Sequence, residues 1–174
     1  MNTNNKKIKH QIRSGTLNED RFVSVIKNYT TAIYRNKRVP TILTDSGSTE
    51  IDIIFYYQNT IFIIEAKNVI SLDGNMCQKN WRFISKTANY IALNPIIQNK
   101  IHVRAFKNNF YKMYKYYPRT ESFVVVPANT YFDINLNKEI LTLPDLDMYL
   151  FNYTPIYDDK YSNNYIPYHL KRMF

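Results

Sequence analysis

Three ionisable residues interrupt two apolar stretches of the chain. Asp52 lies within a run of Ile, Phe and Tyr, and Glu65 and Lys67 close a second such run. A buried charge is costly unless it is paired or binds a metal, so these side chains need partners. Carboxylate oxygens suit hard cations rather than zinc, and a lysine can stabilise the charge that develops during phosphodiester hydrolysis. The pattern predicts a metal-dependent site that cleaves nucleic acid; a salt bridge from Lys67 to either carboxylate is the alternative.

A β-hairpin is expected to carry these residues. Residues 51–57 and 60–67 have the composition of strands, and residues 58–59 form a turn in which Asn tolerates a left-handed backbone. Alternation along the second strand places Glu65 and Lys67 on the same face. Because both strands are apolar on both faces, the sheet should be covered on both sides. The fold class is therefore α/β or α+β, with a central sheet flanked by helices.

A first helix is predicted from Thr16, where apolar residues recur at spacings of three to five. Glu19 stands three positions after Thr16, which is the spacing of a capping box. Glu19 could instead contribute a carboxylate to the site, and local sequence leaves both interpretations open.

A second helix is predicted to begin at Asn94-Pro95, since Asn caps helices and Pro fits the first turn. Its apolar stripe would comprise Ile96, Val103, Phe106, Phe110, Met113 and Tyr117. Gln98 falls on the first turn, off this stripe. Lys100, Arg104 and Lys107 share another face, which either is simply solvated or binds the phosphates of a nucleic acid.

The remaining elements are shorter. Strands are expected at residues 39–44, 81–84, 90–93, 121–127 and 140–143, with a short helix at 144–151. We divide the chain into a basic N-terminal arm (1–14), one domain (15–151) and a Tyr-rich, basic C-terminal extension (152–174). The tyrosines of this extension could stack on bases or could pack the extension onto the domain.

Composition narrows the class of partner. The 174 residues carry a net charge of +9, which favours an anionic partner such as nucleic acid. The single cysteine, Cys77, excludes an intramolecular disulfide and suits a reducing compartment. Because we find neither a long apolar run nor a secretion signal, we expect a cytoplasmic protein that does not interact with membranes.

Four segments, taken together, resemble the nuclease-related domain (NERD) family, a branch of the PD-(D/E)XK restriction-endonuclease-like superfamily. They are the helix bearing Glu19, then Thr49–Asp52, Ile64–Asn68 and Asn94–Gln98. Gly74 and Trp81 also match, and the similarity spans residues 15–126.

The resemblance implies a restriction-endonuclease-like core and a site for Mg²⁺ or Mn²⁺. Asp52, Glu65 and the backbone carbonyl of Ala66 would hold the metal, and Lys67 would be the catalytic lysine. Glu19 would approach from its helix. Gln98 would contact the metal-bound water or the scissile phosphate.

Our leading hypothesis is a metal-dependent DNA endonuclease or nickase, serving phage defence or a mobile element. We expect DNA in preference to RNA as the partner, and the protein could also form a homodimer or bind a partner protein. The alternative is a catalytically inactive module on the same fold that binds nucleic acid or acts as an adaptor. A third interpretation is an interaction subunit whose Tyr-rich extension docks another protein.

Overall fold

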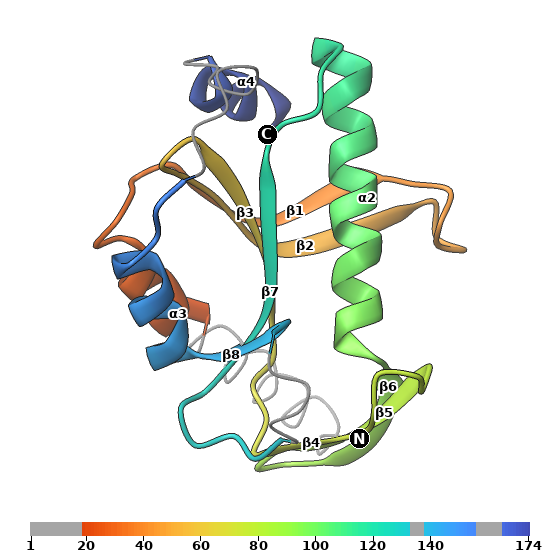
Figure 1. Ribbon diagram of the computed structural model, residues 1–174. Coiled ribbons are helices and arrows are strands. Elements are labelled where there is room, and N and C mark those ends of the chain that lie inside the picture. Colours follow the sequence, from red (N-terminus) through yellow and green to blue (C-terminus); the bar gives the residue numbers. More distant parts are fainter. Residues whose placement is uncertain (1–18, 133–137, 156–164) are drawn as a thin grey trace, which may run out of the picture.

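The computed structural model describes residues 19–132, 138–155 and 165–174. Its centre is a five-stranded sheet in the order β1-β2-β3-β7-β8 (Figure 1). These strands are β1 Ile33–Pro40, β2 Ser48–Tyr57, β3 Thr60–Ala66, β7 Thr120–Val126 and β8 Ile140–Thr142. The first three pair antiparallel, whereas β7 and β8 extend the sheet in parallel. The predicted mixed sheet flanked by helices is confirmed.

The hairpin of β2 and β3 forms as predicted. Tyr57 pairs with Thr60, and the turn residues Gln58 and Asn59 have φ angles of 43° and 60°. Two positive φ angles in a two-residue loop match the right-handed twist of the flanking strands. The turn therefore fixes the register that places Asp52 near the end of β3.

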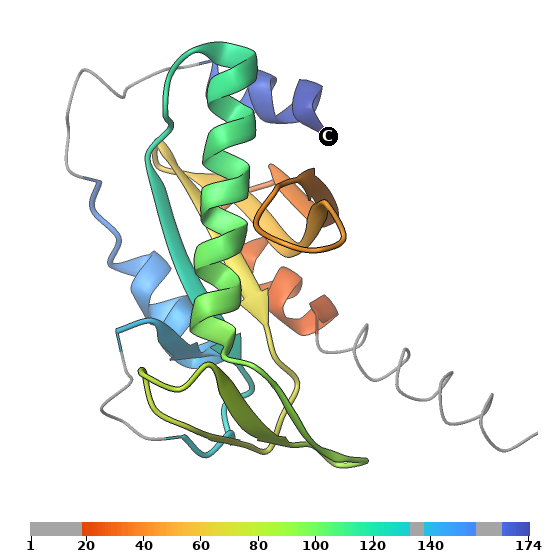
Figure 2. The same cartoon turned by 90° about the vertical axis from the view of Figure 1, so that its right-hand side faces the viewer.

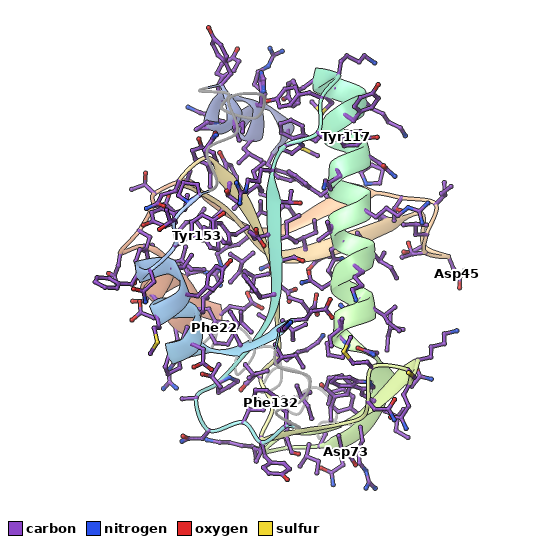
Figure 3. The ribbon with its side chains drawn as sticks, in the orientation of Figure 1. Phe22, Asp45, Asp73, Tyr117, Phe132 and Tyr153 are labelled. Atoms are coloured by element: carbon purple, nitrogen blue, oxygen red, sulfur yellow. The ribbon has the colours of Figure 1, made fainter. Side chains whose placement is uncertain are left out.

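Helices cover both faces of the sheet (Figure 1). They are α2 Pro95–Tyr114, α3 Leu143–Phe151, α4 Ile166–Met173 and a helix at residues 19–26. On one face, Ile61 and Ile63 pack against α2. On the other, Phe62 and Ile64 pack in the cluster that includes residues of α3 and of the helix at 19–26. Figure 3 shows Phe22 and Tyr153 on this second side of β7, away from α2. The alternation predicted for β3 is confirmed.

A separate three-stranded sheet lies beside the first turn of α2 (Figure 2). It contains β4 Ser71–Asp73, β5 Asn80–Ile84 and β6 Asn89–Leu93. Gly74 packs flat against Trp81, since a Cβ at Gly74 would lie 2.4 Å from the indole ring. The indole Nε1 donates to the carbonyl of Asn75 at 2.9 Å. This contact explains why a glycine and a tryptophan occur together in this segment.

The prediction of a strand at residues 39–44 was wrong except for Val39 and Pro40, which end β1. β1 begins at Ile33 and ends at Pro40, and residues 41–47 form a loop that closes at Gly47, whose φ is +69°. The strand was not apparent from the sequence because residues 35–38 are polar. They belong to an edge strand that pairs only with β2, where polar side chains are tolerated.

The apolar stripe predicted for α2 was only partly right. Ile96, Phe106 and Phe110 are buried, but Met113 is 51 % exposed and Tyr117 lies beyond the end of the helix. In their place the helix buries two polar residues, Asn99 and His102. The predicted cap is confirmed, because the Asn94 side chain accepts from the N–H of Ile96 at 2.9 Å.

Parts of the C-terminal extension pack onto the sheet. Ile166 and Leu170 of α4 join the cluster between α2 and the sheet. Tyr153 packs against Phe62 and shares a hydrogen bond of 2.8 Å with Thr60. The contacts of Tyr153, Ile166 and Leu170 favour the interpretation that this part of the extension packs onto the domain rather than stacking on bases. Tyr157, Tyr161 and the predicted helix cap Thr16 lie outside the described residues.

None of the helices in the described part of the chain combines the length and the apolar character needed to cross a bilayer.

Candidate active site

The candidate site lies where β2 and β3 separate. Their pairing ends at Ile53 and Ile64, so the backbone N–H of Ala66 is not part of the ladder between these two strands. The Asp52 side chain takes the place of a strand partner, because Oδ2 accepts from the Ala66 N–H at 2.8 Å. This hydrogen bond holds the Asp52 side chain beside Ala66, the residue between Glu65 and Lys67.

Glu65 is the most enclosed member of the site. Its side chain is 1 % exposed, with Lys67 Nζ at 2.5 Å from Oε1 and His102 Nε2 at 2.7 Å from Oε2. Burial by itself would raise the pKa of Glu65, but the His102 hydrogen bond and the Lys67 charge outweigh it and lower that pKa. Glu65 is therefore a carboxylate at neutral pH.

Lys67 is positioned by three elements. It follows β3, and its backbone N–H donates to the carbonyl of Val125 on β7 at 2.9 Å. Its ammonium group donates to Gln98 Oε1 of α2 at 3.2 Å. Burial alone would lower the pKa of Lys67, but the Glu65 carboxylate outweighs this and raises it. The lysine therefore remains charged, and its side chain is 20 % exposed.

The pKa of the Asp52 carboxyl group is higher than that of an ordinary aspartate. Burial raises its pKa to about 7, with a further contribution from the negative charge of Glu65. The Ala66 hydrogen bond and the Lys67 charge oppose this rise without cancelling it. The two carboxylates are thus close enough to repel each other.

This arrangement fits a hard divalent cation in charge and in ligand chemistry. Above the pKa of Asp52, which is about 7, Asp52 and Glu65 bring two negative charges against the one positive charge of Lys67, and a cation would relieve the excess. Mg²⁺ often binds through only one or two protein carboxylates together with waters and substrate phosphates. Within the described residues, no group of three or more His, Cys, Asp or Glu side chains could hold a metal ion. Among the described side chains of the site, the candidate oxygen ligands are thus the carboxylates of Asp52 and Glu65.

Glu19 is in the neighbourhood of the site but has another partner. Its carboxylate pairs with Arg35 at 3.2 Å, and its charge contributes to raising the pKa of Asp52. The structure therefore brings Asp52, Glu65, Lys67 and Gln98 together, with Glu19 nearby and bound to β1.

Sequence reasoning missed two buried residues of the site. His102 Nε2 contacts Glu65, and His102 Nδ1 lies 2.7 Å from the Thr49 hydroxyl. His102 follows Gln98 by four residues, so both side chains lie on one face of α2. This spacing was the available signal, but no local pattern connects His102 with a glutamate 37 positions away.

The basic residues predicted to bind nucleic acid line a hollow that shares no residue with the candidate site. Lys100, Arg104 and Lys107 line a cavity of about 310 Å³ beside β7, together with Tyr117. Lys100 is paired with Glu139 at 2.9 Å. The structure thus gathers these three residues along α2, around a hollow whose lining includes neither Asp52 nor Glu65.

Comparison with known proteins identifies the family. The model of the nuclease-related domain matches residues 14–127, which includes β1 to β7 and α2. The chain therefore belongs to the nuclease-related domain family. No curated protein and no solved structure matches the chain.

Proposed function

We propose that this protein is a metal-dependent endonuclease or nickase that hydrolyses the phosphodiester bonds of DNA. The observation that carries the proposal is a pair of carboxylates that repel each other, the half-buried Asp52 and the buried Glu65, with Lys67 against them. Membership of the nuclease-related domain family supports the same function.

Each side chain has a distinct part in this proposal. Asp52, Glu65 and the Ala66 carbonyl would hold Mg²⁺ or Mn²⁺, which would activate a water and polarise the scissile phosphate. Lys67 would stabilise the negative charge that develops on the phosphate. Gln98 holds the lysine and is itself only half-buried, so a phosphate could reach it. Glu19 would strengthen the negative field at Asp52.

One observation favours the alternative, a silent module that binds nucleic acid without cutting it. Both oxygens of Glu65 already have protein partners, Lys67 and His102. If the ion pair with Lys67 persists at high metal concentration, Glu65 has no oxygen to offer.

A plasmid-nicking assay separates the two functions. Supercoiled DNA should become nicked or linear with Mg²⁺ or Mn²⁺ and should stay intact with EDTA. Glu65→Ala should remove the activity, and Glu50→Ala, which changes an exposed glutamate of β2, should retain it. Equal cleavage by the wild type and Glu65→Ala would contradict the nuclease assignment, whereas binding without any cleavage would favour the silent module.

We further propose that the basic surface of α2 binds the nucleic-acid backbone. Arg104 and Tyr117 line both the cavity beside β7 and a second cavity of about 620 Å³ at the loop after β1. Tyr111 and Tyr117 stack on each other with ring centroids 4.6 Å apart, and both are half-exposed (Tyr117 is labelled in Figure 3). Cationic side chains beside exposed aromatic rings suit a strand with unpaired bases.

The salt dependence of binding tests this surface. Arg104→Gln combined with Lys107→Gln should weaken DNA binding and reduce the slope of log K against log salt by about 0.7–0.9 for each phosphate that the variant no longer neutralises. Fluorescence anisotropy in EDTA measures binding without cleavage. Lys86→Gln, at an exposed lysine between β5 and β6, is the matched control. An unchanged slope in the double variant would show that DNA binds elsewhere.

A further inference from the structure

A chain of three side chains runs behind the candidate site, from β2 through α2 to β3. The Thr49 hydroxyl lies 2.7 Å from His102 Nδ1, and His102 Nε2 lies 2.7 Å from Glu65 Oε2. All three residues are buried, with 8 %, 2 % and 1 % of their surfaces exposed. Because these three side chains are shielded from water, each of them must find its hydrogen-bond partners within the protein.

The direction of the hydrogen bond to Glu65 follows from the chemistry of the partners. Glu65 Oε1 pairs with the Lys67 ammonium group at 2.5 Å, so Glu65 is bound as a carboxylate whose oxygens accept. His102 Nε2 must therefore carry a hydrogen and donate it to Oε2. Thr49 can either donate to Nδ1 or accept from it, and in both cases it fixes the rotation of the imidazole ring.

The two oxygens of Glu65 consequently have different roles. Oε2 is directed into the protein and is held by His102, whereas Oε1 faces the half-buried Lys67. Gln98, one helical turn before His102, holds the same lysine from the same face of α2. One helix thus sets the position of both Glu65 and Lys67.

We infer that His102, held by Thr49, is a positioning residue that fixes Glu65 so that only Oε1 is available to a divalent cation. This inference rests on the proposed metal-dependent function. It assigns His102 no contact with substrate or metal, since both of its ring nitrogens are occupied by Thr49 and Glu65. Hydrogen-bond partners of metal-binding carboxylates typically change metal affinity by 10–100-fold when they are removed.

Two substitutions at position 102 separate the donor from the bulk of the ring. In His102→Gln the amide nitrogen can occupy the place of Nε2 and still donate to Glu65. In His102→Asn the shorter amide can reach Thr49 but not Glu65. We expect His102→Gln to bind Mn²⁺ with nearly wild-type affinity and His102→Asn to bind it about 10–100-fold more weakly.

Isothermal titration calorimetry with Mn²⁺ in the absence of DNA measures these affinities, and circular dichroism verifies the fold of each variant. Equal Mn²⁺ affinity in the wild type and both variants would overturn the positioning role, as would equal weakening in both. If neither variant folds, Thr49→Val and Thr49→Ser decide the question, because only serine retains the hydroxyl. Thr49→Val should then bind Mn²⁺ more weakly than Thr49→Ser, and equal affinities would overturn the inference.

The wild-type titration separates this inference from the proposed function. If the wild type binds no Mn²⁺, the proposed metal site itself is wrong and the role of His102 falls with it. If the wild type binds Mn²⁺ and Glu65→Gln does not, while both position-102 variants match the wild type, only the positioning role is overturned.

Discussion

Asp52→Asn should stabilise the metal-free protein at pH 8 by about 2–4 kcal/mol, because the folded state raises the pKa of Asp52 from 3.8 to about 7. Between these two values the folded protein binds more protons than the unfolded chain. Stability due to this group therefore falls as pH rises from about 4 to about 7. Asparagine removes the half-buried charge and retains an oxygen that can accept from the Ala66 N–H.

Urea unfolding in EDTA at pH 5, 6, 7 and 8 measures this effect. The advantage of Asp52→Asn over the wild type should grow with pH and level off above pH 7. Asp73→Asn, at an exposed aspartate of β4, is the control and should change stability little at any pH. If Asp52→Asn is equally or less stable than the wild type at pH 8, the charge of Asp52 is not destabilised by partial burial and by repulsion from Glu65.

Lys67→Met should reduce cleavage by about 10²–10³-fold, since it removes a positive group from the place where phosphate charge develops. The same variant should bind Mn²⁺ at least as tightly as the wild type. The reason is geometric: Lys67 Nζ lies 2.5 Å from Glu65 Oε1 and competes with a cation for that oxygen. Methionine retains most of the apolar volume and has no charge.

Plasmid nicking and calorimetry together test this prediction, with Lys86→Met as the control at an exposed lysine. Abolished cleavage with retained or tighter Mn²⁺ binding would place Lys67 in the chemistry rather than in metal binding. Abolished Mn²⁺ binding would show that the lysine supports the structure of the site. A rate near that of the wild type would remove Lys67 from the catalytic residues.

The hairpin could be predicted from sequence because its rules are local. Alternation along β3 fixes which side chains share a face, and Asn59 marks the turn. The helix start at Asn94-Pro95 is also local, since a cap side chain bonds to an N–H only two residues away. These rules placed Glu65, Lys67 and Gln98 on elements that the structure brings together.

His102 and Thr49 could not be predicted in this way because their roles depend on packing. The hydrogen bond between Thr49 and His102 joins residues 53 positions apart and exists only because α2 lies across β2 and β3. From the sequence alone, a histidine on a helix cannot be distinguished from a polar residue on the surface, because its burial depends on how the helix packs. The same reason explains why the strand prediction near β1 was wrong. The polar residues of β1 adopt a strand conformation because they pair with β2, and this pairing is not apparent from the local sequence.

The most direct measurement is a crystal structure with Mn²⁺ soaked in and located by its anomalous scattering. We predict one Mn²⁺ ion bound by oxygens of both Asp52 and Glu65, with Glu65 Oε2 still held by His102 and Lys67 released from Oε1. At saturating Mn²⁺, an intact ion pair between Lys67 and Glu65 with no ion at Asp52 would contradict the proposed metal site.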